Sequence, residues 1–377
     1  SDSEIHIEVT YLTNGHERLI SFDLGLKVPF HSGLQWDVHG VVGPALAYEH
    51  FQQTHEDGSV SSEGALGVVT RRLGWVANSW TGDAPAKVNL LLRVLEQRED
   101  GYHRIETVLH TLELADTLRL DFLDGDSDQL ELEGVAEGAL GPPEANLAVR
   151  AAEGFRRVLA TRGTRLPGIR VRLSKRIPHG AGLGGGSSDA AAVLRGLNAL
   201  LEDALPPADL MRLGAGIGSD VPFFVSGAAR AVAWGRGERV LELPDLPPRE
   251  VLLAVPEPPI STDWAYGVLA SRRARESAAP AHPRFGYGEA PGPSDEWAGV
   301  RGEAQNDFEE ALFPLRPELA LIKANLLGVG GAPALLCGSG AAVFGVFDHQ
   351  DALERGASAV GGDARVFRTR TSVTERR

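Results

Sequence analysis

The sequence predicts an α+β protein with two domains and an additional N-terminal segment. The chain has 377 residues, which is more than a single domain usually contains. Stretches with strand-like alternation and stretches with helical spacing follow one another, most clearly on either side of a glycine-rich loop at 178–191. The sequence changes character near residue 83 and again at the prolines of 244–248. These changes predict a division into 1–82, 83–245 and 246–377.

The composition argues against several classes of protein. The formal net charge is −14 and the basic residues are scattered, so a nucleic-acid-binding surface has little support. No apolar stretch approaches the roughly 18 residues of a membrane helix, and the N-terminus lacks a signal-peptide pattern. Cys337 is the single cysteine, which excludes an internal disulfide and suits a reducing compartment. We therefore expect a cytoplasmic protein without a nucleic-acid or membrane partner.

Residues 1–82 are the least informative part of the chain. Glu4–Leu12 and Ile20–Leu24 alternate enough to predict two strands. The segment has no internal repeat, no metal-ligand spacing and no nucleophile motif, so we assign it no function.

Ala84–Leu92 predicts a strand with Lys87 and Asn89 on one face and Val88 and Leu90 on the other. Polar residues on one face of a strand are usually exposed to solvent. Lysine is scarce in this chain, however, and stands only at positions 27, 87, 175 and 323. A lysine inside a motif is then of interest for its compact ammonium group.

The next motif, R-E-D-G-Y-H at Arg98–His103, combines an Asp-Gly turn with the start of another strand. Taken singly, Tyr102 would cover the core and His103 would be a surface residue. An acidic, glycine-rich connection at 124–143 predicts a hairpin and a loop. A helix follows, and its expected N-cap is Asn146.

The glycine-rich loop at 178–191 reads P-H-G-A-G-L-G-G-G-S-S-D-A-A and joins a predicted strand, Ile169–Ile177, to a predicted helix. The first N–H groups of a helix lack internal partners and lie at the positive end of its dipole, so they attract anions. Glycine accepts positive φ and has no Cβ to hold a phosphate oxygen off the backbone. A helix entry capped only by Ser187 or Ser188 would need fewer glycines. We therefore predict a phosphate-binding loop.

Other phosphate loops fit this stretch poorly. Gly180, Gly182 and Gly185 satisfy the dinucleotide pattern G-x-G-x-x-G. The strand before that pattern should be buried on both faces, whereas this one has arginines at alternate positions. The chain contains no G-x-x-x-x-G-K-[ST] sequence and lacks the H-R-D and D-F-G triplets of protein kinases.

Beyond the loop, Pro207–Ile217 predicts a short helix, followed by G-S-D-V-P-F-F at 218–224. Pro222 biases Val221 towards an extended conformation, so we expect Asp220 on a turn rather than in a helix. A lone aspartate in such a place is commonly a cap or turn residue.

The C-terminal part begins with Val251–Val255, which predicts a buried strand. Residues 272–300 are rich in Ala, Pro, Gly and charge, and they predict a mobile surface loop.

Several separated motifs together resemble those of the small-molecule kinases that include galactokinase, homoserine kinase, mevalonate kinase and phosphomevalonate kinase. The loop at 178–191 resembles their P-x-x-x-G-L-G-S-S-A-A motif. Its G-L-G-G-G-S-S-D-A-A form points to the branch that acts on 4-diphosphocytidyl-2-C-methyl-D-erythritol in the non-mevalonate route to isoprenoids. The A-P-A-K-V-N-L, R-E-D-G-Y-H and G-S-D-V-P-F-F sequences resemble further motifs of that branch. The resemblance spans roughly residues 84–370 and leaves 1–82 uncovered.

Two more stretches resemble motifs of the same branch: the G-R-G-E turn within a closing hairpin at 231–243, and the segment 259–266. N-D-F-E at 306–309 and L-C-G-S-G-A-A-V-F at 336–344 continue the series. The resemblance implies an N-terminal ribosomal-protein-S5-like domain and a C-terminal ferredoxin-like α/β domain, with the active site in the cleft between them.

By this resemblance, the chain uses ATP and Mg²⁺ to phosphorylate the C2 hydroxyl of the cytidine compound. Asp220 corresponds to the catalytic base and Lys87 to the lysine of the catalytic centre. A cation a few ångströms away favours the charged form of a carboxylate, so we expect Lys87 to orient Asp220 and keep it ionised. Ser219 replaces the usual alanine. No carboxylate near the loop is an obvious Mg²⁺ ligand, so we expect the ion on the ATP phosphates, with Ser187 or Ser188 as the protein donor.

The resemblance also implies a substrate site. Tyr102 corresponds to the residue that stacks on the cytosine ring, and His103 to the one that helps to hold it. Tyr266 corresponds to the second face of this sandwich, with Trp264 as the alternative if the alignment is off by two. Asn89 would lie near the substrate. Three residues of the last motif, Gly338, Ser339 and Gly340, would close around it, whereas Cys337 is expected to pack rather than react.

The resemblance extends to the nucleotide site, where Asn146 and Lys175 are carried over with the loop. The residues predicted to bind ATP are Asn146, Lys175, Pro178, Gly180, Gly182, Leu183, Gly184, Gly185, Gly186, Ser187 and Ser188.

Three other functions stay open at this point. A sister kinase acting on homoserine, mevalonate or a sugar would share the glycine loop but should lack the R-E-D-G-Y-H motif. A non-catalytic nucleotide-binding protein would tolerate loss of Lys87 or Asp220, and neither is lost. An NAD-dependent oxidoreductase is the competitor from a different class. We expect a small-molecule kinase that is a monomer or a weak homodimer.

Overall fold

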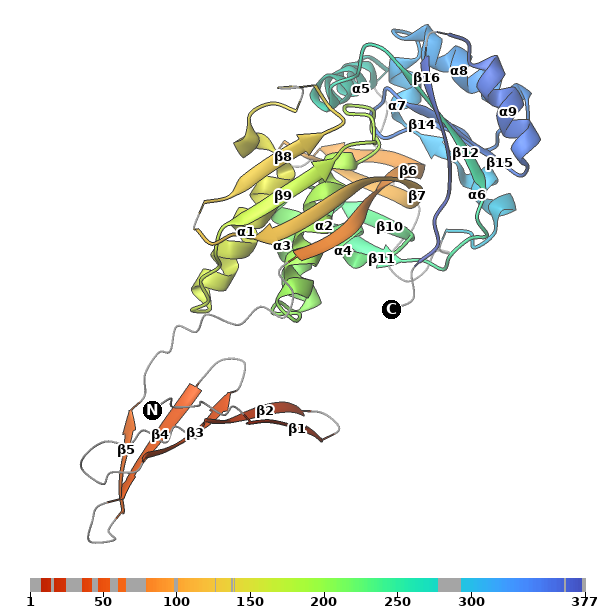
Figure 1. Ribbon diagram of the computed structural model, residues 1–377. Helices are drawn as coiled ribbons and strands as arrows, with labels where there is room; N and C mark the ends of the chain where they lie inside the picture. The colour runs from red at the N-terminus through yellow and green to blue at the C-terminus, as the bar shows by residue number, and fades with distance from the viewer. Residues whose placement is uncertain are drawn as a thin grey trace. The chain divides into compact units, whose positions relative to one another are not determined.

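The computed structural model describes residues 79–97, 101–125, 127–136, 138, 140–276, 293–362 and 364–374, and the backbone of five earlier strands (Figure 1). The chain divides into two compact units, Ser1–Gly74 and Trp75–Arg377, and each is considered by itself.

The first unit is an antiparallel sheet whose strands lie in chain order. Its strands are β1 (Glu8–Asn14), β2 (Glu17–Leu24), β3 (Trp36–Val42), β4 (Ala47–Thr54) and β5 (Val60–Ala65). The two strands predicted here overlap β1 and β2, and the part of the first prediction before residue 8 lies outside the described residues.

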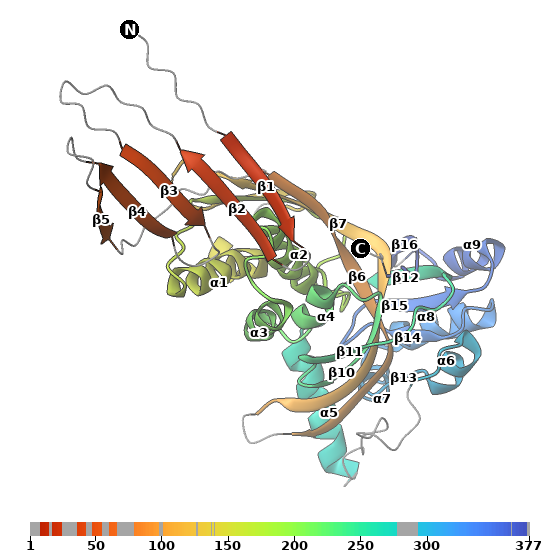
Figure 2. The same ribbon diagram turned by 90° about the horizontal axis from the view of Figure 1, so that it is seen from below.

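The second unit begins with a long antiparallel pair, β6 (Ser79–Gln97) and β7 (His103–Phe122), that curves through its whole length (Figure 2). The pair belongs to a seven-stranded sheet with the order β11-β10-β7-β6-β13, while β9 joins β7 and β8 joins β9. The added strands are β8 (Gln129–Glu133), β9 (Ile169–Ser174), β10 (Arg230–Gly235), β11 (Arg239–Glu242) and β13 (Gln305–Asn306). The hairpin predicted within 124–143 is wrong, because β8 pairs in parallel with the later strand β9.

Helices cover one face of this sheet and bury its first core (Figures 1 and 2). They are α1 (Leu147–Thr161), α2 (Gly185–Leu200), α3 (Pro207–Ile217) and α4 (Val221–Ser226), with a 3-10 turn at Pro143–Ala145. The alternation of β9 buries Ile169, Val171 and Leu173 against these helices, as the period-2 pattern predicts. Val221 opens α4 rather than extending the chain. Pro222 is tolerated there because the N–H it lacks has no partner in a first helical turn.

A second sheet has the strand order β14-β15-β12-β16. Its strands are β12 (Glu250–Pro256), β14 (Ala334–Leu336), β15 (Val343–Phe347) and β16 (Ala364–Arg370). The helices of this region are α5 (Thr262–Glu276), α6 (Trp297–Glu303), α7 (Phe308–Leu312), α8 (Pro317–Gly328) and α9 (Gln350–Ala359). No helix among the described residues has the length and apolar character needed to cross a membrane.

The loop predicted at 272–300 is too long at both ends. Helix α5 continues to residue 276, where Arg273 pairs with Asp307 at 2.8 Å. Helix α6 starts at Trp297 because that side chain and Val300 are buried. Residues 277–292 lie outside the described part of the chain.

The β6–β7 pair links the two sheets and so positions the centre of the unit. Ala86, Val88 and Leu90 point into a core that also contains Val251 of β12 and Phe344 of β15. The opposite face of β6 carries Lys87 and Asn89. Both are buried, contrary to the usual exposure of polar residues on one strand face.

Candidate active site

Lys87 lies at the centre of the second unit, with its ammonium group close to Asp220. The distance from Lys87 Nζ to Asp220 Oδ2 is 3.6 Å, and the side chains are 5 % and 28 % exposed. Asp220 directly precedes α4, and the Lys87 N–H donates to the carbonyl of Leu183 in the glycine loop at 2.9 Å. A partly exposed carboxylate therefore lies beside a buried cation at the loop.

Asn89 fixes this lysine from the same strand face. Its Oδ1 accepts from Lys87 Nζ at 2.8 Å and from the Gly338 N–H at 3.0 Å, while its Nδ2 donates to Thr107 Oγ1 at 2.8 Å. Asn306 holds the segment that contains Gly338, since its Nδ2 donates to the carbonyls of Leu336 and Gly338, each at 2.8 Å. Protein groups thus occupy much of the hydrogen-bonding capacity of Asn89, which acts here to position Lys87.

The glycine loop wraps around the same lysine and touches the last glycine motif. A Cβ at Gly184 would lie 2.9 Å from Lys87 Cγ, and one at Gly182 would lie 2.0 Å from the Cys337 carbonyl oxygen. Both glycines have positive φ, +74° and +78°. No side chain can replace either hydrogen without moving the backbone, so these positions require glycine.

A pocket of about 300 Å³ opens over the loop and the start of α2. The N-cap of α2 is Gly184, and no side chain caps the helix. Its first backbone N–H groups therefore lack side-chain partners and lie at the positive end of the helix dipole, beside the pocket. Ten of the predicted ATP-binding residues line the pocket: Asn146, Lys175, Pro178, Gly180, Gly182, Leu183, Gly184, Gly185, Gly186 and Ser187. Ser188 is buried behind them, and its Oγ has no hydrogen-bond partner among the described residues.

Asn146 also has the cap role that its position predicts. Its Oδ1 accepts from the Ala148 N–H at 2.9 Å at the start of α1. Asn146 therefore both caps α1 and lines the pocket.

Lys175 is held in a buried cluster at one end of the pocket. Its Nζ donates to Asp116 of β7 and, at 2.7 Å, to Asp189 of α2. The second oxygen of Asp116 accepts from the N–H groups of Arg176 and Ile177, so the strand leading into the loop is fixed as well. We call Asp116, Lys175 and Asp189 the buried triad. It ties β7, β9 and α2 together around the loop.

The triad contains more negative than positive charge and is almost dry. The three side chains are between 0 and 5 % exposed. Burial, together with the charge of Asp116, raises the pKa of the Asp189 carboxyl to about 7, although the Lys175 ammonium acts in the opposite direction. The two carboxylates in turn raise the pKa of Lys175 against the opposing effect of its own burial.

Aromatic residues from β7, α5 and α7 pack together near Asp220. Tyr266 of α5 stacks on His103 with ring centroids 5.0 Å apart and meets Phe308 edge-on at 4.9 Å. Burial, and next the Asp220 carboxylate, raise the pKa of Tyr266 to about 12. The Tyr266 hydroxyl thus stays protonated within reach of the Asp220 charge. Burial lowers the pKa of His103, and Arg273 adds to this effect.

Tyr102 is an exposed aromatic residue that contacts Arg236. The residue is 56 % exposed, and the Arg236 guanidinium lies over its ring, 5.3 Å from the ring centroid. Trp264, the alternative partner, is 43 % exposed. Tyr266 stacks on His103, and the sandwich of a cytosine ring between Tyr102 and Tyr266 stays a prediction.

The last glycine motif closes the site from the second sheet. Ser339 Oγ lies 3.2 Å from Thr262 Oγ1. Cys337 is fully buried, and this burial raises the pKa of its thiol to about 12, which disfavours the reactive thiolate.

Sequence reasoning missed three contributors to this region. Asp116 and Asp189 anchor Lys175, and Asn306 holds the Gly338 carbonyl. Asp189 and Asn306 stand inside recognised motifs, so their position was the available signal. Asp116 lies in no motif, and only the pairing of β7 with β9 brings it to Lys175.

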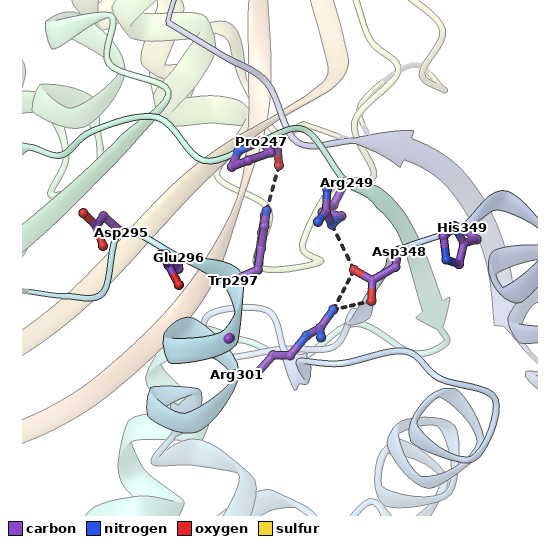
Figure 3. A pocket seen from close by; sticks show the side chains of 9 residues that line it. Pro247, Arg249, Asp295, Glu296, Trp297, Arg301, Asp348 and His349 are labelled. Atoms are coloured by element: carbon purple, nitrogen blue, oxygen red, sulfur yellow. Dashed lines mark hydrogen bonds and ion pairs between the residues drawn. The ribbon is translucent and has the colours of Figure 1, made fainter.

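A second hollow lies away from this site, beside Trp297 (Figure 3). The Trp297 Nε1–H donates to the Pro247 carbonyl at 2.7 Å. Asp348 accepts from Arg301 at 2.7 Å and from Arg249 at 2.9 Å, so it holds two arginines at the wall (Figure 3). These pairings are structural, and the hollow contains none of the residues predicted for the site.

Comparison with protein families agrees with this arrangement. The GHMP kinases N terminal domain matches residues 146–228, and the GHMP kinases C terminal domain matches residues 297–364. The first match contains the glycine loop and Asp220, and the second contains the last glycine motif.

Similar sequences identify the branch of this family. A 4-diphosphocytidyl-2-C-methyl-D-erythritol kinase of Solibacter usitatus is 40 % identical over 283 residues, covering 74 % of this chain and 85 % of the relative. That of Moorella thermoacetica is 41 % identical over 278 residues, covering 73 % and 92 %.

Solved structures give the same result. A crystal structure of 4-(cytidine 5'-diphospho)-2C-methyl-D-erythritol kinase superposes with a TM-score of 0.61 at 35 % identity, covering 78 % of this chain and 99 % of the other. Homoserine kinase from Cytophaga hutchinsonii, at 17 % identity and a TM-score of 0.56, shares the fold. The chain belongs to the 4-diphosphocytidyl-2-C-methyl-D-erythritol kinase family of the GHMP kinases.

Proposed function

We propose that this chain transfers the γ-phosphoryl group of ATP to the C2 hydroxyl of 4-diphosphocytidyl-2-C-methyl-D-erythritol. The observation that carries the proposal is the Lys87–Asp220 pair at 3.6 Å, beside a glycine loop whose helix start is uncapped. Relatives that bear the name of this kinase support the choice of substrate.

Asp220 is the proposed general base. Phosphoryl transfer to an alcohol needs the triphosphate held in line and the proton of the attacking hydroxyl accepted as transfer proceeds. Asp220 is partly exposed and can meet a substrate hydroxyl, whereas Lys87 is buried and held by Asn89. Lys87 then orients the carboxylate and stabilises negative charge on the attacking oxygen.

The loop and α2 are the proposed phosphate site. The uncapped N–H groups at the start of α2 and the positive end of its dipole would hold the β- and γ-phosphates. The described residues contain no group of three or more His, Cys, Asp or Glu side chains arranged for a metal ion. Mg²⁺ needs few protein ligands when nucleotide phosphates supply the others, so one hydroxyl suffices. Ser187, on the pocket wall, fits this role, and Mg²⁺ would neutralise charge on the transferring phosphoryl group.

The cytidine end of the substrate belongs, in this proposal, to the aromatic side of the site. Tyr102 is exposed, so its ring could stack on a base, and stacking contributes about 1–3 kcal/mol per base. The His103–Tyr266 stack would form the adjoining wall, with the edge of His103 available to the cytosine. Gly338, Ser339 and Gly340 would close over the erythritol part.

The remaining predictions follow from this function. We propose that 83–245 is the ATP-binding domain and 246–377 the second kinase domain, with 1–82 an extension of unassigned role. A cytoplasmic location and a monomer or weak homodimer stay predictions.

An ATP-consumption assay with Mg²⁺ tests the proposal against a panel of acceptors: the cytidine compound, homoserine, mevalonate and galactose. We expect turnover with the cytidine compound alone. Turnover with another acceptor would keep the Lys87–Asp220 chemistry and refute the substrate pocket. Turnover with none of them would contradict the proposal.

A further inference from the structure

The turn between β10 and β11 carries an arginine whose role the mechanism leaves open. Gly235 and Gly237 have positive φ, +81° and +113°, on either side of Arg236. The Glu238 carboxylate accepts from the Arg236 backbone N–H at 2.6 Å, so the turn is closed by its own side chain. The backbone at Arg236 is therefore fixed, while the guanidinium is engaged only through its contact over Tyr102 among the described interactions.

This turn contacts both ends of the proposed substrate path. Gly235 pairs with Ile105 on β7, two residues after His103. A Cβ at Gly237 would lie 3.4 Å from Ile105 Cδ1 and equally close to Cβ of Ser219, the residue before Asp220. Arg236 thus lies between the aromatic residues of the cytidine end and the base of the reacting end.

The charge of Arg236 is not taken up by a neighbouring acid. The other cations of the region have carboxylate partners: Arg93 pairs with Glu106, Arg273 with Asp307 and Lys87 with Asp220. Within the described part of the chain, Arg236 has no ion pair, and it is half-buried. A half-buried guanidinium without a counter-ion is suited to an anionic ligand.

We infer that Arg236 binds the diphosphate that joins the cytidine to the erythritol of the substrate. This inference rests on the proposed function. The diphosphate lies between the base and the reacting hydroxyl in the substrate, as Arg236 lies between Tyr102 and Asp220 in the protein. The planar guanidinium can donate two N–H groups to the phosphate oxygens while it stays over the Tyr102 ring.

Binding of cytidine and of cytidine diphosphate, measured by calorimetry without ATP, tests the inference independently of turnover. We expect the wild-type protein to bind cytidine diphosphate about ten- to hundredfold more tightly than cytidine, as a charge-assisted bidentate contact would give. Arg236→Gln should reduce this preference to less than about threefold while leaving cytidine affinity unchanged. Arg236→Lys should restore part of it, because the charge returns without the planar fork.

Arg239→Gln is the matched control, since Arg239 is exposed on β11, three residues away. It should keep the wild-type preference, and thermal melting should confirm that all variants are folded. Full preference in Arg236→Gln would overturn the inference. Equal loss of affinity for both ligands would place Arg236 on the base and would overturn it too. A wild-type protein that binds neither ligand would instead contradict the proposed function, and the inference with it.

Discussion

Two lysine–carboxylate clusters lie on either side of the same glycine loop, and they are built in opposite ways. Lys87 lies 3.6 Å from Asp220, whose side chain is 28 % exposed, and a neutral amide holds the lysine in place. Lys175 is clamped between two carboxylates that are at most 4 % exposed. The first cluster leaves a charged oxygen available to a ligand, whereas the second leaves almost none.

This difference suits the Lys87–Asp220 pair to catalysis and the buried triad to holding the loop in place. A carboxylate that is to accept a proton has to remain reachable and only loosely paired, at a cost in stability. A clamp can be dry, because its charges compensate one another, and breaking such a buried pair leaves an uncompensated charge. The predictions below test whether the two lysines divide the work in this way.

Lys175→Met should have the largest effect on stability. It leaves Asp116 and Asp189 buried without their cation, which costs about 3–5 kcal/mol. Urea unfolding followed by circular dichroism measures the loss. The same substitution at Lys87 is the control and should cost less than half as much, because Asp220 can be hydrated. Equal losses of unfolding free energy in the two variants would contradict the different roles of Lys175 and Lys87.

Lys87→Met should have the complementary effect, on turnover. Removing one preorganised electrostatic group typically lowers kcat by about 10²–10³. The KM for ATP should change little, since the loop is anchored by Lys175. Steady-state kinetics on the folded variant checks this, and a kcat within threefold of wild type would exclude Lys87 from the catalytic centre.

Asp189→Asn should change how stability depends on pH. The folded pKa of about 7 lies above the ordinary value of 3.8, so between these values the folded protein keeps a proton that the unfolded chain has released. The contribution of Asp189 to the free energy of unfolding therefore falls as pH rises, by about 1–3 kcal/mol between pH 5 and pH 8. Unfolding of both proteins across this range isolates the effect. Parallel curves would contradict the raised pKa.

Tyr102→Ala should have the smallest effect, confined to the cytidine substrate. Loss of one stacking surface raises its KM by about tenfold, with the KM for ATP unchanged. Trp264→Ala, which removes another exposed aromatic side chain, serves as the comparison. A larger effect from Trp264 would move the stacking role to that residue.

The sequence identified the first cluster better than the second. Lys87, Asp220 and the loop stand in short motifs, so local residue types and order were enough. The burial of Lys87 was not predicted, because it depends on two glycine segments that are far apart in sequence packing against one strand.

The buried triad depends on topology that no local pattern contains. Asp116 lies 59 residues before Lys175 and meets it only because β7 pairs with β9. The extent of α5 and α6 was also missed, because the ion pair of Arg273 and the burial of Trp297 override an apparently loop-like composition. Burial and ion pairing between distant parts of the chain thus determine the buried triad and the ends of α5 and α6, which composition and periodicity did not predict.

The most direct test of the division between chemistry and support is the single-turnover rate of Asp220→Asn with ATP, Mg²⁺ and the cytidine compound. General-base catalysis contributes about 10²–10⁴, so we expect the transfer rate to fall by that factor. Both ligands should still bind, and the melting temperature should stay near that of wild type. A transfer rate within threefold of the wild-type value, at saturating ligands, would show that Asp220 is not the base and would contradict the account.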